Sequence, residues 1–292
     1  MPTLPLVIVR RLRETSATVN AMPVSRESGR IRRMFADISP RYDLLNHLLS
    51  LNLDRGWRRA AARAVGARPG ERVLDLCTGT GDLAIEVSRA LARPGSPQGS
   101  GSGAGGLVIG ADFTREMLSI AAKKASQCTR GAPVRFAAGD ALDLPFATGA
   151  FDAVTAAFGV RNFEDLDRGL EEILRVLRPG GRAVILEFAA RRGGPIDAAF
   201  RFYFHHLLPR VGGWVSGSRE GKSAYAYLPA SVLEFPSPAE LAARMERRGF
   251  RSVRHRTLSF GVVSLHVGFR PAAHQEALEP RAAASEMEGT LR

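Results

Sequence analysis

The amino-acid sequence predicts a doubly wound α/β fold, in which helices cover both faces of a mostly parallel sheet. Short apolar runs alternate along the chain with amphipathic stretches of helical length, and a glycine-rich turn follows the first of these runs. Strands that alternate with helices pair in parallel, because the chain crosses the sheet through a helix before each new strand. The chain of 292 residues is long enough for one large α/β domain with additions.

The N-terminal part is expected to divide into an arm and a helical region. Residues 1–30 lack sustained periodicity and end in a stretch rich in serine, arginine and glycine, which is typical of a mobile basic arm. Translation could start at Met1 or at Met22. Residues 31–65 carry apolar side chains at helical spacing, and a Pro-Gly pair then breaks the pattern.

The alternating region follows this break. The expected strands are residues 72–76, 107–112, 134–138, 151–157 and 182–188. The expected helices between them are 82–91, 114–126 and 165–177, the last closed by an Arg-Pro-Gly-Gly turn. A further helix at 238–248 precedes two runs, 252–258 and 262–269, that flank Phe260-Gly261 as an antiparallel hairpin. The sheet is therefore expected to be mostly parallel, with an antiparallel hairpin at its end.

Two segments stand outside this pattern. Residues 93–106 form a low-complexity Gly/Ser tract and are expected to be a flexible surface loop inserted in one connection. Residues 195–229 are aromatic and partly helical, and we expect them to form an insert on the substrate side. We predict a single domain over residues 31–270, followed by a disordered tail at 271–292.

Composition limits the classes of partner. The chain has 41 Lys and Arg against 29 Asp and Glu, a net charge of +12, which invites nucleic acid or an anionic membrane surface. No known nucleic-acid-binding motif accompanies the charge, so we predict no nucleic-acid partner. No apolar run approaches the ~18 residues that span a bilayer. Cys77 and Cys128 provide neither a disulfide framework nor a metal-ligand set, which favours the reducing cytoplasm and no metal.

The first strand runs into a glycine turn and then a helix, in the sequence VLDLCTGTGD. Gly79 and Gly81 let the backbone turn tightly beside a ligand, while the helix N-terminus offers free N–H groups. The pattern also fits a dinucleotide-binding fingerprint. Asp75 and Asp82 would repel a pyrophosphate but attract the sulfonium and ammonium groups of S-adenosylmethionine. The charges thus favour a methyl donor, although each aspartate could instead cap the turn or the helix.

Two further acidic residues follow later strands. Asp112 ends the second expected strand, where a carboxylate can accept both ribose hydroxyls. It lies 31 residues after Gly81, but without the 14-residue Gly/Ser tract the spacing becomes 17, near the ~20 expected. Asp140 follows the third expected strand, at the edge where open α/β sheets bind ligands. Together with Asp75 they form a constellation that is more specific than any one aspartate.

Six longer motifs also occur in order along the chain. They are FADISPRYDLLNHLLSLNLDRGWRR at 35–59, LDLCTGTGD at 74–82, FGVRNFED at 158–165, VLRPGGRAVILEF at 176–188, YFHHLLPRVG at 203–212 and AYAYLPASVLEFP at 224–236. On these motifs the chain resembles class I methyltransferases and, more narrowly, the ubiquinone/menaquinone biosynthesis C-methyltransferase family (UbiE/MenG), from about Met34 to Arg270. The resemblance implies a Rossmann-like, mostly parallel seven-stranded sheet.

The resemblance also implies a donor site for S-adenosylmethionine. Its residues would be Thr80 in the glycine loop, Asp112 at the ribose, and Asp140 with Ala141 near the adenine. A serine that often contacts the donor is replaced here by Ala157, so its hydroxyl contact is absent, although packing could remain. The CTGTG and YAYLPASV wording is similar to that of menaquinone-type members and implies demethylmenaquinol as acceptor. A ubiquinone precursor, 2-methoxy-6-polyprenyl-1,4-benzoquinol, or both acceptors stay open.

Methyl transfer to a ring carbon requires donor and acceptor in line at about 3–3.5 Å. Arg161 and Asn162 follow the fourth expected strand and should face the site. We hypothesise that Arg161 stabilises the developing quinolate, because a guanidinium is a poor base but a good charge partner. The alternative is an ion pair of Arg161 with Glu164 or Asp165.

The general base could be His206 or Asp140. His206 has the better unperturbed pKa, although it could equally be structural. An apolar entrance for an isoprenoid tail could be lined by Tyr42, Phe200, Phe202, Tyr203, Phe204 and Trp214. Basic residues near it, Arg55, Arg58, Arg59 and Arg201, could hold the enzyme on the inner face of the membrane. The expected partners are therefore a lipophilic quinol, peripheral membrane contact and, as a further option, a second copy in a homodimer.

Three rival functions differ from this prediction. An NAD-dependent oxidoreductase is disfavoured by the acidic residues beside the glycine loop. A non-catalytic membrane-associated scaffold is disfavoured because Thr80, Asp112, Asp140 and Arg161 are all present. A nucleic-acid methyltransferase of the amino-methylating kind would carry an Asn/Asp-Pro-Pro-aromatic motif, which this sequence lacks.

Overall fold

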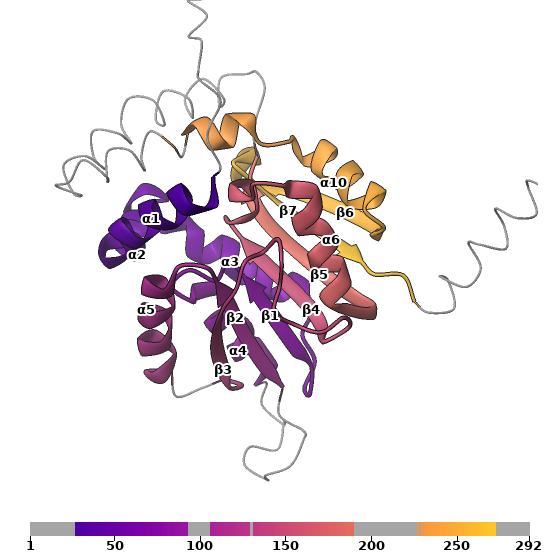
Figure 1. Cartoon of the computed structure of the whole chain (residues 1–292), viewed down its shortest axis with the longest axis horizontal. Coiled ribbons are helices and arrows are strands. Elements are labelled where there is room, and N and C mark those ends of the chain that lie inside the picture. The colour runs from indigo at the N-terminus through magenta and orange to yellow at the C-terminus, as the bar shows by residue number, and fades with distance from the viewer. Residues whose placement is uncertain (1–26, 93–105, 129–130, 190–226, 228, 273–292) are drawn as a thin grey trace, which may run out of the picture.

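The computed structural model describes residues 27–92, 106–128, 131–189, 227 and 229–272 (Figure 1). Its centre is a seven-stranded sheet in the order β3-β2-β1-β4-β5-β7-β6. The strands are β1 (Arg72–Leu76), β2 (Leu107–Asp112), β3 (Val134–Ala138), β4 (Phe151–Ala157), β5 (Leu177–Phe188), β6 (Arg251–Leu258) and β7 (Val263–Phe269). The first five pair in parallel and β7 pairs antiparallel with both β5 and β6. The doubly wound sheet with a terminal hairpin is confirmed.

β5 is the strand that departs most from the sequence prediction. It was expected to start at residue 182, after a turn, but it starts at Leu177. Leu177 pairs with Phe151, and the register then shifts so that Arg182 pairs with Ala153. The Arg-Pro-Gly-Gly sequence is thus absorbed as an irregularity inside one long strand, because the flanking residues pair with the same neighbour.

Helices connect the strands and precede the sheet. They are α1 (Ser28–Ile38), α2 (Tyr42–Leu49), α3 (Leu53–Val65), α4 (Asp82–Leu91), α5 (Arg115–Ser126), α6 (Leu166–Val176) and α10 (Pro238–Arg247), with short 3-10 turns at Ser39–Arg41, Val160–Asn162 and Ser259–Gly261. α1 begins at Ser28, so the last residues of the expected arm are helical. A capping box at Ser237 and Glu240 opens α10, which explains its sharp start.

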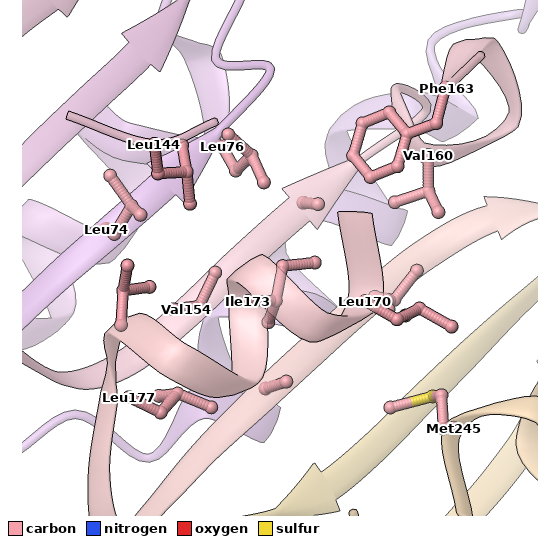
Figure 2. Packing of buried hydrophobic residues seen from close by; sticks show 14 of the residues in the cluster. Leu74, Leu76, Leu144, Val154, Val160, Phe163, Leu170, Ile173, Leu177 and Met245 are labelled. Carbon is pink, nitrogen blue, oxygen red and sulfur yellow. The ribbon is translucent and has the colours of Figure 1, made fainter. Parts of the chain in front are cut away.

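Side chains that alternate along each strand build two cores. On one face, Val73, Ala153 and Val184 pack with α3 and α4. On the other face, Leu74, Val154 and Ile185 pack with α6 and α10. Figure 2 shows the second core, in which Ile173 and Leu170 of α6 lie over β4 and Met245 approaches from α10. Burial on both faces explains why the central strands β1, β4 and β5 are largely apolar in sequence.

Several expected features fall outside the described residues. They are the arm up to residue 26, most of the Gly/Ser tract, residues 190–226 of the expected insert, and the tail from residue 273. His206 and the aromatic residues from Phe200 to Trp214 belong to this group. Within the described ranges, no helix combines the length and the hydropathy needed to span a bilayer.

Candidate active site

A pocket lies over the carboxyl ends of the parallel strands and encloses about 730 Å³, including space open to solvent. It is lined by Phe35, Tyr42, Leu76, Cys77, Gly79, Asp112, Phe113, Thr114, Met117, Gly139, Asp140, Ala141, Leu142, Ala157, Phe158, Gly159, Asn162, Phe163 and Glu164. Phe35 and Tyr42 come from the N-terminal helices α1 and α2, and the other residues lie at or after the carboxyl ends of β1, β2, β3 and β4. Parallel strands end at one edge, so residues distant in sequence meet there.

Two neighbouring strands end in left-handed residues at this pocket. Cys77 follows β1 with φ of 53°, and Phe158 follows β4 with φ of 59°. Such angles are unfavourable for residues with a Cβ and are often found at functional sites. Gly159 permits the close approach, because a Cβ at this position would lie 2.3 Å from the Cys77 Cβ. The two turns therefore bring the backbone of both strand ends against the pocket.

Asp112 is held rigidly at the end of β2. Its carboxylate accepts hydrogen bonds from the Gly79 N–H at 2.9 Å and the Thr114 N–H at 2.8 Å, one on each oxygen. Burial raises the pKa of Asp112, while these N–H donors act in the opposite direction. Each oxygen keeps a lone pair for a further donor. With this geometry the two oxygens can accept hydrogen bonds from two neighbouring hydroxyl groups, such as those of a ribose, which is the role expected for Asp112.

The other pocket-lining residues from the donor-site prediction surround Asp112. Asp140 is exposed, and its Oδ1 accepts the Leu142 N–H at 2.9 Å, which turns the chain past the pocket. Ala141 follows it, and Gly79 and Ala157 line the pocket from the ends of β1 and β4. The structure therefore brings Gly79, Asp112, Asp140, Ala141 and Ala157 together.

Asp75 lies outside this group. It pairs in register with Thr155, on the face of the sheet that carries α3 and α4. Its oxygens accept the Thr78 hydroxyl at 2.6 Å and the Thr155 hydroxyl at 2.7 Å, and the residue is 1% exposed. Of the three aspartates expected to meet at the strand ends, Asp112 and Asp140 line the pocket and Asp75 does not, because its side chain lies on the sheet face that α3 and α4 cover. Through its hydrogen bonds to Thr78 and Thr155, Asp75 attaches the glycine loop to β4.

Burial raises the pKa of Asp75 to about 6, from an ordinary value of 3.8. Between these values the folded protein binds more protons at this residue than the unfolded chain, so stability falls as pH rises through the interval. We expect the free energy of unfolding of wild type, minus that of Asp75→Asn, to decrease between pH 4 and pH 7, by at most about 3 kcal/mol. Urea titrations at four pH values measure this difference.

The comparison of wild type with Asp75→Asn also removes the contribution of His266, another buried group whose pKa is strongly shifted. Burial lowers the pKa of His266 to about 4, so this histidine contributes stability that is lost as pH falls from about 6.5 towards 4. The sign is opposite to that of Asp75, but His266 is present in both proteins. A difference that stays flat, or that rises with pH, would contradict the assignment to Asp75.

Thr80 and Gly81 also lie outside the set of described residues that line the pocket. The Thr80 hydroxyl donates to Asp43 of α2, and Lys124 of α5 bonds Asp43 at 2.8 Å and also contacts Asp82. Gly81 opens α4 with φ of 84°, and a Cβ there would lie 3.0 Å from the Ala121 Cβ of α5. Both residues therefore fix the loop against α2 and α5, and the sequence did not reveal these partners.

Arg161 pairs with a residue that the sequence analysis did not consider. Its Nη1 donates to Glu187 Oε1 at 2.9 Å and to the Phe158 carbonyl, and its guanidinium lies 5.4 Å from the Phe188 ring centroid. Both partners are buried, with side chains 7% and 0% exposed. The sequence offered Glu164 or Asp165 as alternative partners, whereas the ion pair observed is with Glu187, which the pairing of β4 with β5 brings beside Arg161.

Asn162 and Tyr42 face the pocket directly. The Asn162 Oδ1 accepts the Tyr227 hydroxyl at 3.0 Å, which ties the turn after β4 to the segment before α10. Tyr42 stands in T-shaped contact with Phe35, and burial raises the pKa of its phenol. The positive charge of Arg161 acts on the Tyr42 phenol in the opposite direction, which places Arg161 within electrostatic reach of the pocket.

The fold and the pocket define a class I methyltransferase architecture, with a buried carboxylate, Asp112, at the end of the second strand. The model of the ubiE/COQ5 methyltransferase family matches residues 23–270, and the chain belongs to this family. It is 50% identical over 238 residues to the demethylmenaquinone methyltransferase of Deinococcus radiodurans, which covers 82% of this chain and 91% of that protein.

A second relative carries a broader name. The ubiquinone/menaquinone biosynthesis C-methyltransferase UbiE of Geobacter sulfurreducens is 43% identical over 239 residues, covering 82% of this chain and 88% of that protein. Among solved structures, the cyclase SpnF aligns with a TM-score of 0.58 at 17% identity, over 86% of this chain and 98% of that one. A cyclase on this fold shows that architecture alone does not determine the reaction.

Proposed function

We propose that this enzyme transfers the methyl group of S-adenosylmethionine to a ring carbon of a polyprenylated quinol, with demethylmenaquinol as the acceptor. The observation that carries the proposal is the 50% identity to a demethylmenaquinone methyltransferase over 82% of this chain. The family model matches residues 23–270, a range that contains the described residues lining the pocket. The ubiquinone precursor is the second candidate, since another relative is named for both pathways.

The residues of the pocket fit S-adenosylmethionine. Asp112 offers a buried, oriented carboxylate for the ribose diol, and Asp140 and Ala141 stand beside it for the adenine. The positive φ of 54° at Gly79 exposes loop backbone where a side chain would otherwise project towards Tyr42. Asp75 does not line the pocket, so we assign it the support of the loop. The donor supplies an electrophilic methyl group on a sulfonium.

The protein's own contribution is orientation, charge and exclusion of water. Phe35, Tyr42, Phe113 and Phe158 give the pocket an apolar wall that suits a quinol ring and excludes water from it. Asn162 can donate its amide N–H to a quinol oxygen, because Tyr227 already satisfies its carbonyl oxygen. We retain Arg161 as the group whose charge stabilises the developing quinolate: it is not among the described residues that line the pocket, but its charge acts to lower the pKa of Tyr42, which does line it. Asp140 or His206 would take the hydroxyl proton.

Methyl transfer measures this function directly. Purified protein in detergent receives labelled S-adenosylmethionine with either reduced demethylmenaquinone or the reduced 2-methoxy-6-polyprenyl-1,4-benzoquinone precursor. We expect labelled menaquinone as product, and comparable rates with both quinols would assign a dual acceptor. Donor binding without transfer to either quinol would refute the acceptor assignment while leaving the methyltransferase class intact. Binding of NAD in preference to S-adenosylmethionine would refute the class itself.

Asp112→Asn is expected to weaken the binding of S-adenosylhomocysteine by about 10-fold to 100-fold, because charge-assisted hydrogen bonds contribute roughly 1.5–3 kcal/mol. The asparagine also places an NH2 group against one of two N–H donors that the carboxylate now accepts. Calorimetric titration gives the affinity. Asp140→Asn, at an exposed position in the same pocket, is the control and should have the smaller effect. Equal affinities for wild type and Asp112→Asn would exclude the ribose role.

A further inference from the structure

Two large apolar side chains project into solvent near the entrance side of the sheet. Phe260 is 81% exposed and Leu51 is 77% exposed, which makes them the most exposed large apolar residues in the described part of the chain. Leu53, at the start of α3, is 49% exposed. Single exposed apolar residues are ordinary, but three on adjacent turns call for a physical explanation.

The backbone conformation of Leu51 and Phe260 is also unfavourable, so neither the conformation nor the exposure of these residues stabilises the folded chain. Leu51 has φ of 52° and Phe260 has φ of 57°, both in the left-handed region that favours glycine. Each turn therefore holds a large apolar side chain in an unfavourable conformation and presents it to water. A glycine would relieve both costs. Bulky residues held in this region recur at ligand-binding and other functional sites.

The two turns are joined to each other and lie on the pocket side. The Trp57 indole N–H donates to the Ser259 hydroxyl at 2.8 Å, which attaches the β6–β7 turn to α3. Leu53 lies one helical turn before Trp57, and Phe260 directly follows Ser259. The β6–β7 turn also adjoins Val263, which pairs with Phe188 at the carboxyl end of β5. The pocket opens at the same ends of the parallel strands.

We propose that Leu51, Leu53 and Phe260, here called the apolar rim, insert into an anionic lipid bilayer. Arg55 and Arg59 are exposed on α3 just beyond the rim, and the chain carries a net charge of +12, so anionic headgroups complement it. The rim would then hold the mouth of the pocket at the membrane, where a lipophilic quinol is dissolved. Only this last step rests on the proposed function.

Vesicle binding tests the rim with the full-length chain. We expect sedimentation with vesicles of phosphatidylglycerol and phosphatidylcholine, and weaker binding to pure phosphatidylcholine. The variant Leu51→Ser/Phe260→Ser should bind at least about tenfold more weakly, because two buried apolar side chains are lost. Phe269→Ser is the control: Phe269 is 38% exposed and pairs with Arg182, at the end of β7 opposite to the rim. It should bind as wild type does.

The outcomes separate this proposal from the proposed function. Methyl transfer in detergent should be unaffected by Leu51→Ser/Phe260→Ser. If the wild-type protein transfers no methyl group to the quinol but still binds vesicles, the acceptor assignment is refuted and the membrane proposal stands. Absence of vesicle binding by wild type, or equal binding by the rim variant, would overturn the membrane proposal. A smaller oligomeric mass of the rim variant in analytical ultracentrifugation would show that the rim is an interface between two copies of the chain. That result would also overturn the membrane proposal.

Discussion

Gly159→Ala is expected to abolish most binding of S-adenosylhomocysteine and to lower the melting temperature by several degrees. The new Cβ would lie 2.3 Å from the Cys77 Cβ and 2.9 Å from its Sγ, far inside van der Waals contact. Both residues line the pocket and follow paired strands, so the clash would push the ends of β1 and β4 apart. Overpacking of this kind costs about 1–3 kcal/mol. Calorimetric titration and thermal unfolding give the two effects.

The clash has a specific remedy, which makes the explanation testable. Cys77→Gly removes both contacting atoms and relieves the left-handed φ of 53° at that position. The backbone at Gly159, with φ of −112° and ψ of −31°, accepts alanine without strain. The variant Gly159→Ala/Cys77→Gly should therefore recover most of the donor affinity. A double variant no better than Gly159→Ala would show that the clash with Cys77 is not the cause.

Local patterns in the sequence were sufficient for most of the sheet. The expected strands at 72–76, 107–112, 134–138 and 151–157 have the observed bounds. Each is a short, largely apolar run with a helix or turn signal on both sides, and in β1, β2 and β4 burial on both faces makes the run easy to recognise. β5 was misjudged at its start because the position of Leu177 depends on its pairing with Phe151, which no local pattern reveals.

The site was predictable only where it follows strand ends. Asp112 and Asp140 could be placed because carboxyl ends of parallel strands share an edge. The position of Asp75 could not be read from its strand alone, because side chains alternate between the two faces of the sheet, and only the packing of α3 and α4 shows which face Asp75 is on. The partners of Thr80 could not be found either. Asp43 and Lys124 lie 37 and 44 residues away, and helix packing alone brings them together.

Glu187 shows the same limit and leads to the largest expected loss of stability. Ala157, the last residue of β4, pairs with Leu186, so the turn after β4 lies beside the end of β5, and Arg161 of that turn contacts Glu187 of β5. Glu187→Ala would remove the carboxylate that the buried Arg161 guanidinium contacts at 2.9 Å. We expect it to lower the free energy of unfolding by about 3–5 kcal/mol, a large part of the roughly 5–15 kcal/mol of a typical domain. Urea unfolding followed by circular dichroism measures the loss.

A milder substitution separates charge from hydrogen bonding. The Glu187 carboxylate also accepts the backbone N–H groups of Arg161 at 3.2 Å and Phe188 at 2.9 Å. Glu187→Gln removes the charge and replaces one of the two oxygens by an NH2 group, so one backbone N–H keeps its acceptor and the other loses it. We therefore expect a smaller loss than with alanine, which removes both acceptors. Loss of stability equal to that of Glu187→Ala would mean that the charge of Glu187, and not its hydrogen bonds, holds the strand ends.

The pair also allows a test of whether Arg161 serves structure or catalysis. Replacing both charged partners of a buried pair often restores stability, because no charge is left uncompensated. Arg161→Met/Glu187→Gln should therefore be more stable than Glu187→Ala. If the charge of Arg161 stabilises the developing quinolate, kcat of this double variant should still be about 100-fold below wild type, the effect typical of such groups. Recovery of stability together with kcat would instead assign Arg161 to holding Phe158 and Glu187 in place.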